Sequence, residues 1–113
     1  MSNLRPAPVG IYELLQDFEC GGASVRIMRL SGTAAAVKPH LHHRSMQIYV
    51  AIEGTSIIDT DGAETALSPY EVLEVPPGQL HSARPASGSS ILVNISIPPL
   101  AADDQIPGGA SRP

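Results

Sequence analysis

The sequence is poor in the features that mark several large classes of protein. Its single cysteine, Cys20, cannot form an internal disulfide, which favours a cytoplasmic protein. The formal net charge is −4 and no run of basic residues occurs, so we expect no nucleic-acid partner. No apolar stretch approaches the length of a membrane span, and residues 1–6 lack the apolar core of a secretory signal, so we expect no membrane partner.

The common signatures of nucleophilic catalysis are also missing. The chain has neither a Gly-x-Ser-x-Gly motif nor a glycine-rich phosphate loop. Cys20 stands beside two glycines with no basic neighbour to activate its thiol. Any chemistry must therefore come from another kind of group.

The sequence does contain many short apolar runs separated by turn residues. Its 113 residues suit one domain with one core, and the short runs predict an all-β sandwich or barrel. Asp61-Gly62 between two such runs predicts a hairpin. Residues 11–18 carry apolar side chains at helical spacing, and both a short helix and a covering strand fit them. The strands that we expect span residues 25–30, 33–37, 48–52, 55–59, 63–67, 71–75 and 91–97.

The expected organisation has three parts. Residues 1–24 form an arm and covering segment, and residues 25–97 form the barrel. Residues 98–113 are rich in proline, glycine and small residues, so we expect a tail that crosses onto a neighbour or stays mobile. Neither an internal repeat nor a second domain is visible.

Residues 39–54 hold three of the four histidines. His40 and His42 are two apart, so in an extended strand their imidazoles point to one face. Gln47 opens the next apolar strand, and His81 follows a rigid proline-glycine turn that can bring a third imidazole to the same place. Three imidazoles and an amide oxygen predict a site for a divalent first-row metal ion.

These residues resemble the two motifs of the cupin superfamily, in its small single-domain form. His40-x-His42, then four residues, Gln47, six residues and Gly54 match the first motif, and Pro76-Pro77-Gly78-Gln79-Leu80-His81 matches the core of the second. The resemblance covers about residues 30–97. It implies an all-β double-stranded β-helix, or jelly roll, with a metal inside its mouth held by His40, His42, Gln47 and His81.

The chain departs from the cupin pattern at Gln47, which stands where the family has an acidic ligand. Its amide either ligates the metal or hydrogen-bonds a bound water. A neutral ligand set leaves the ion its full double charge, which strengthens Lewis acidity and attracts anionic ligands. The nitrogen-rich set suits Fe, Mn, Zn, Ni or Cu better than magnesium.

Further candidates surround this set. Tyr49 shares the face of Gln47, and its hydroxyl either donates a hydrogen bond to a metal-bound group, as a catalytic residue, or packs in the core. His43 faces the other side of its strand and is expected in solvent, and the alternative is that it ligates the metal or hydrogen-bonds a ligand. Glu53 is a strand-end charge or an acid-base group. Four arginines lie near the motif strands, and either one of them pairs with a carboxylate-bearing ligand or all are solvated: Arg26, Arg29, Arg44 and Arg84.

The cupin resemblance implies dioxygenases, isomerases, lyases and cyclases, and we expect a dioxygenase-like or isomerase-like enzyme acting on a small organic substrate, anionic ones included. The alternatives are a non-catalytic module that binds or senses a small ligand, and a structural dimer with a vestigial site. Ile48, Val50 and Ile52 form the outer face of the Gln47 strand. An apolar outer face expects cover, so we predict a homodimer.

Overall fold

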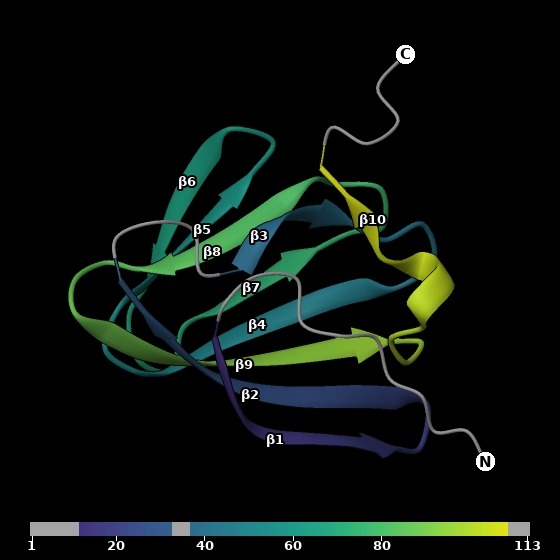
Figure 1. Cartoon of the computed structure of the whole chain (residues 1–113), viewed down its shortest axis with the longest axis horizontal. Coiled ribbons are helices and arrows are strands. Elements are labelled where there is room, and N and C mark those ends of the chain that lie inside the picture. The colour runs from purple at the N-terminus through teal and green to yellow at the C-terminus, as the bar shows by residue number, and fades with distance from the viewer. Residues whose placement is uncertain (1–11, 33–36, 109–113) are drawn as a thin grey trace.

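The computed structural model describes residues 12–32 and 37–108, and these form two antiparallel five-stranded sheets packed face to face (Figure 1). The first sheet has the order β1-β2-β9-β4-β7, and the second has the order β10-β3-β8-β5-β6. This arrangement confirms the all-β double-stranded β-helix. The strands of the first sheet are β1 (Glu13–Cys20), β2 (Ala23–Ser31), β9 (Ser89–Ile97), β4 (Met46–Glu53) and β7 (Val72–Val75). Those of the second sheet are β10 (Ile106–Pro107), β3 (Val37–Leu41), β8 (His81–Pro85), β5 (Ser56–Thr60) and β6 (Ala63–Leu67).

Of the two alternatives for residues 11–18, the helix is wrong and the strand is confirmed from residue 13 onward. Ile11 lies outside the described residues. β1 pairs antiparallel with β2, and its register shifts between Leu14 and Gln16. A bulge adds one residue to a strand, so apolar side chains on either side of it are no longer two apart. Leu14 pairs with the buried Met28, whereas Phe18 pairs with Val25 on the outer face and is 42% exposed, so the helically spaced apolar residues do not share one face. The strand expected at residues 33–37 falls mostly outside the described part of the chain, and Val37 opens β3.

The inner face of the first sheet changes from polar to apolar along its strands. Cross-strand partners on β2, β9 and β4 form three inward rows. The rows are Ser24–Ser96–Gln47, then Arg26–Asn94–Tyr49, then Met28–Leu92–Ala51. The third row belongs to the hydrophobic core with Leu30, Ile58 and Val75, each fully buried. Burying each large aliphatic side chain stabilises the fold by about 1.5–3 kcal/mol. The third row and the core residues around it therefore stabilise the barrel, and the two polar rows are available to form a site.

Residues 98–108 return to the barrel. A 3-10 helix η1 (Ala102–Asp104) precedes β10, which pairs with β3 through Ile106–Leu41 and Pro107–His40. The N–H of Gly108 donates to the Pro39 carbonyl oxygen at 2.8 Å. The segment that was expected to be a tail therefore extends the second sheet, and only residues 109–113 lie outside the description.

The outer face of the first sheet is apolar at its centre. Ile48 pairs with Ile95, and Val50 pairs with Val93, on the neighbouring strands β4 and β9. All four are half-buried, and Ile52 is 40% exposed. The homodimer stays a prediction. Among residues 12–32 and 37–108, no helix is long and apolar enough to cross a membrane.

Candidate metal centre

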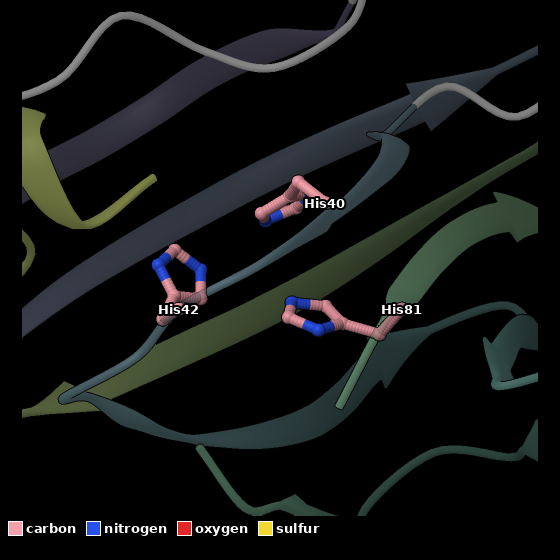
Figure 2. A group of neighbouring side chains, drawn as sticks. All are labelled: His40, His42 and His81. Carbon is pink, nitrogen blue, oxygen red and sulfur yellow. The ribbon is translucent and has the colours of Figure 1, made fainter. Parts of the chain in front are cut away.

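Three histidines converge between the sheets (Figure 2). His40 on β3 and His81 on β8 are direct cross-strand partners, and His42, two residues after His40, is the first residue beyond the end of β3. The ring centroid of His40 lies 4.4 Å from that of His81 and 4.9 Å from that of His42. One ligating nitrogen from each ring lies within 4.8 Å of the others. A metal with bonds of about 2.1 Å to nitrogen needs only small side-chain movements to bind all three.

Hydrogen bonds fix which nitrogen of each ring faces the cavity. Every Nδ1 donates to a backbone carbonyl oxygen, at 2.8 Å in His40, 2.7 Å in His42 and 2.9 Å in His81. A carbonyl oxygen only accepts, so each Nδ1 carries the proton and each Nε2 keeps its lone pair. Among the described residues, the buried Nε2 atoms of His42 and His81 have no hydrogen-bond partner, so their lone pairs are available to a metal ion. The carbonyls belong to Lys38, Asp104 and Gln79.

Burial keeps the three rings neutral. It lowers the pKa of His40 to about 3, with the neighbouring His81 adding to the effect, and it lowers the pKa of His81 to about 4. Burial also lowers the pKa of His42, partly offset by its hydrogen bond to Asp104. Metal ligation requires neutral imidazole, so the centre is ready to bind at pH 7 without losing protons.

We expect the metal-free protein to lose stability as the pH falls from about 6.5 towards 4. The unfolded chain protonates its histidines near pH 6.5, whereas the folded chain resists until about pH 3 to 4. Each such histidine makes the free energy of unfolding fall by up to about 1.4 kcal/mol per pH unit in that window. Urea unfolding at several pH values measures how steeply the free energy of unfolding changes with pH. His81→Gln should make this change less steep, and an equal slope in that variant would contradict the prediction.

Gln47 faces the histidines from the first sheet. It is 2% exposed and lines the same cavity as His40 and His42. The Ser96 hydroxyl lies 3.0 Å from Gln47 Oε1 and 3.3 Å from Asn94 Oδ1, yet one hydroxyl proton cannot serve both oxygens well. Gln47 Nε2 is buried and has no hydrogen-bond partner in the described part of the chain. A half turn of the amide lets Nε2 donate to Ser96 and presents Oε1 to the cavity. Ligation by Gln47 stays a prediction, and Ser96 is the residue that would orient it.

Gln47→Glu is expected to tighten binding of Zn²⁺ by about tenfold or more, because an anionic oxygen replaces a neutral one beside the cation. The measurement is a titration against a competing chelator. Gln16→Glu adds the same charge at an exposed position of β1 and should leave the affinity unchanged. If Gln47→Glu leaves the affinity for Zn²⁺ unchanged, residue 47 does not contact the ion.

Asp104 holds the loop that carries His42, and sequence reasoning missed it. Its side chain is 1% exposed, and its carboxylate accepts backbone N–H groups of His43 at 2.7 Å and of Arg44 and Ser45 at 3.1 Å. Burial alone would raise the pKa of Asp104, but these hydrogen bonds outweigh it and hold the pKa below its usual value. Its own carbonyl oxygen receives the His42 Nδ1 proton. Nothing in the local sequence marks this aspartate as buried.

The other candidate residues differ in burial and in their distance from the histidines. Tyr49 is 2% exposed with its ring centroid 6.0 Å from that of His81, and burial raises the pKa of its phenol, so the hydroxyl keeps its proton. His43 and Glu53 are exposed, and His43 is not in the cluster. Arg26 is buried at 4% exposure. The remaining three arginines, as expected of solvated groups, make ion pairs near the surface: Arg29–Glu13, Arg44–Asp103 and Arg84–Glu64.

An open hollow lies between the sheets, with about 300 Å³ of space between atoms when the adjoining solvent is included. His40 and His42 line one side of it, and Arg26, Asn94 and Gln47 project from the facing sheet. The C-terminal segment contributes Leu100 and Gln105 to the wall.

Comparisons with known proteins agree with this architecture. No curated protein matches the chain. A cupin protein from Bacteroides fragilis has a TM-score of 0.62 and 21% identity, over 100% of this chain and 92% of that one. A protein with a double-stranded β-helix domain from Klebsiella pneumoniae has a TM-score of 0.65 and 19% identity, over 84% and 83%. A sugar phosphate isomerase of the cupin superfamily from Silicibacter pomeroyi has a TM-score of 0.58 and 16% identity, over 68% of this chain and 51% of that one.

These likenesses show the fold. The family model of the cupin domain matches residues 26–97, which is more than half of the sequence. The match contains all three converging histidines and the strands that carry them. The chain therefore belongs to the cupin family.

Proposed function

We propose that this cupin is a metal-dependent enzyme that acts on a small organic substrate in the cavity, with isomerase-like or dioxygenase-like chemistry. The observation that supports the proposal is the convergence of three neutral imidazoles, from His40, His42 and His81, whose ligating nitrogens lie within 4.8 Å of one another. His40 and His42 also line the cavity. A divalent Fe, Mn, Zn, Ni or Cu ion suits these ligands and would supply Lewis acidity or, for a redox-active ion, dioxygen activation.

The residues around the centre fit the binding of a polar substrate. Tyr49 keeps its phenolic proton, so it serves as a hydrogen-bond donor to a substrate oxygen rather than as a base. The buried amides of Gln47 and Asn94 offer further polar contacts. The Silicibacter pomeroyi neighbour is described as a sugar phosphate isomerase, which favours the isomerase-like branch by analogy of fold alone.

The test begins with protein purified without a histidine tag. Anaerobic loading with each of the five metals, followed by elemental analysis, should give about one ion per chain. Small hydroxyaldehydes and hydroxyketones in heavy water then report isomerase chemistry through deuterium exchange seen by NMR. An oxygen electrode reports dioxygenase chemistry. Wild-type protein that takes up none of these metals would overturn the proposal.

One observation favours a second candidate, a non-catalytic module that binds or senses a small ligand. Among the described residues that line the cavity, none is a carboxylate. The usual proton acceptors of acid–base catalysis are thus missing from the wall. Metal-dependent ligand binding without turnover or oxygen consumption is the result that identifies this function.

We also propose that a second copy covers the outer face of the first sheet. Ile48, Val50, Val93 and Ile95 place apolar side chains side by side there, and the same patch on two subunits can pair about a two-fold axis. Light scattering at micromolar concentration should give the mass of a dimer, and Val50→Lys should give that of a monomer. A monomeric wild type would contradict the dimer.

A further inference from the structure

We infer that residues 98–108 form a gate over the metal centre, and that metal binding and closure of this gate favour each other through His42. The gate consists of the segment after β9, the helix η1, the strand β10 and Gly108. The inference rests on the proposed function, because it needs an ion at the histidines. It adds how the ion is retained and how access to it is controlled.

One hydrogen bond distinguishes His42 from the other two histidines. His40 and His81 each donate from Nδ1 to the carbonyl oxygen two residues earlier in the chain, so the local backbone orients both rings. His42 donates instead to the carbonyl oxygen of Asp104 at 2.7 Å, across a separation of 62 residues. Asp104 belongs to the gate. The orientation of one of the three imidazoles therefore depends on where the gate lies.

This hydrogen bond gives the coupling its sign. A cation at Nε2 of His42 withdraws electron density from the ring, which makes the Nδ1–H group a stronger donor to Asp104. An ion therefore favours the closed gate, and the closed gate holds Nε2 towards the centre. The two effects are reciprocal. The factor by which the ion favours closure equals the factor by which closure raises the affinity for the ion.

The closed gate leaves too little room for an organic ligand. Leu100 and Gln105 belong to the gate and line the cavity together with His40 and His42. The centre of a water molecule reaches about 20 Å³ of this space, which is room for about one or two waters. A larger ligand therefore requires part of the wall to move away.

The gate is attached to the barrel by few strand pairs. The lining residues on β2, β9 and β4 belong to strands that pair with one another along most of their length. The gate has two cross-strand pairs, Ile106–Leu41 and Pro107–His40. Segments with so few pairs open locally at a much lower free energy than the strands of a core. The gate is therefore the part of the described wall that we expect to move.

The remaining contacts of the gate act at separate points. Ser24 Oγ accepts the N–H of Leu100 at 2.8 Å. Ser45 Oγ donates to the carbonyl oxygen of Pro98 at 2.8 Å. The Asp104 carboxylate accepts the backbone N–H groups of residues 43–45. The gate thus holds the loop after His42 as well as the His42 ring, and opening releases both.

Gly108 allows the end of the gate to approach β3 closely. Its N–H donates to the Pro39 carbonyl oxygen at 2.8 Å. A Cβ at this position would lie 2.9 Å from Pro39 Cβ, 3.0 Å from the Pro39 oxygen and 3.2 Å from Leu80 Cδ1. Gly108 is not among the residues that line the cavity. Gly108→Ala should therefore push the gate away from β3 while all three histidines are kept.

The first test compares metal-free and Zn²⁺-loaded wild-type protein, purified at full length without a tag. Hydrogen exchange followed by mass spectrometry measures the backbone amides of residues 100–108. Zinc should slow their exchange by about tenfold or more beyond its effect on β6, which forms the opposite edge of the same sheet. If zinc slows exchange equally at both edges, it stabilises the whole fold and the gate is overturned.

The second test uses Gly108→Ala. Exchange in the gate should become faster, the affinity for Zn²⁺ should fall by about threefold or more, and a chelator should remove the ion sooner. Gly22→Ala is the matched control, because its added Cβ meets nothing within 4 Å, and it should change none of these quantities. A gate that exchanges faster in Gly108→Ala while the zinc affinity stays at the wild-type value would overturn the coupling. Elemental analysis keeps the two proposals apart, because wild-type protein without zinc contradicts the proposed function instead.

Discussion

His81→Ala is expected to weaken Zn²⁺ binding by about a hundredfold or more and to abolish any metal-dependent activity, since one of three converging Nε2 donors is lost. His81 is 2% exposed, and its ring lies 4.4 Å from that of His40 between centroids. No other described histidine reaches the cluster to replace it. Titration against a competing chelator and elemental analysis measure the loss directly.

His43→Ala is the matched control. His43 lies next to His42 but is exposed and outside the cluster, and its contact with Asp104 uses the backbone N–H, which alanine keeps. Its metal affinity should equal that of the wild type. If His81→Ala and His43→Ala bind zinc equally well, the three histidines do not share an ion.

Asp104→Ala is expected to destabilise the protein by about 3 kcal/mol or more, because three backbone N–H groups lose a charged acceptor in a buried place. The affinity for zinc should fall by about ten- to a hundredfold as well, because the loop that positions His42 loses its anchor. Urea unfolding of the metal-free protein gives the first quantity, and a chelator titration gives the second. Asp104→Asn keeps one acceptor oxygen, so its stability and its zinc affinity should lie between those of the wild type and those of Asp104→Ala.

The neighbouring Asp103 supplies the control. Its carboxylate is exposed and pairs with the exposed Arg44 at 2.7 Å, the kind of surface pair that contributes about 0–1 kcal/mol. Asp103→Ala should therefore leave both the unfolding midpoint and the metal affinity near the wild-type values. Equal effects of the two substitutions would show that Asp104 has no positioning role.

The histidine cluster could be predicted because its geometry is local. Alternation in a strand places His40 and His42 on one face, and the proline-glycine turn before His81 leaves few paths for the chain. The all-β class was predicted from the short apolar runs along the chain, and the jelly roll was implied by the resemblance of the two histidine motifs to cupins. Each of these signals lies within a short stretch of sequence.

The features that could not be predicted from the sequence depend on contacts between residues that are far apart in the chain. Asp104 hydrogen-bonds the loop of His42, which lies more than fifty residues away in the sequence, and no sequence pattern near Asp104 predicts that it is buried. The apolar residues of β1 point to both faces of its sheet, with Phe18 exposed, so the sequence pattern could not separate this strand from a helix. Arg26 could have been found, because Met28 and Leu30 share its face, but an inward arginine is uncommon enough that solvent was the natural alternative.

The histidines belong to the second sheet and the segment after β3, whereas Arg26 and Asn94 line the cavity from the first sheet, and this separation has an evolutionary consequence. Substitutions on the inner side of β2 and β9 can change the shape and polarity of the cavity wall while the three imidazoles stay untouched. One histidine cluster can therefore be retained in descendants whose cavities differ, which suits a scaffold reused for many functions.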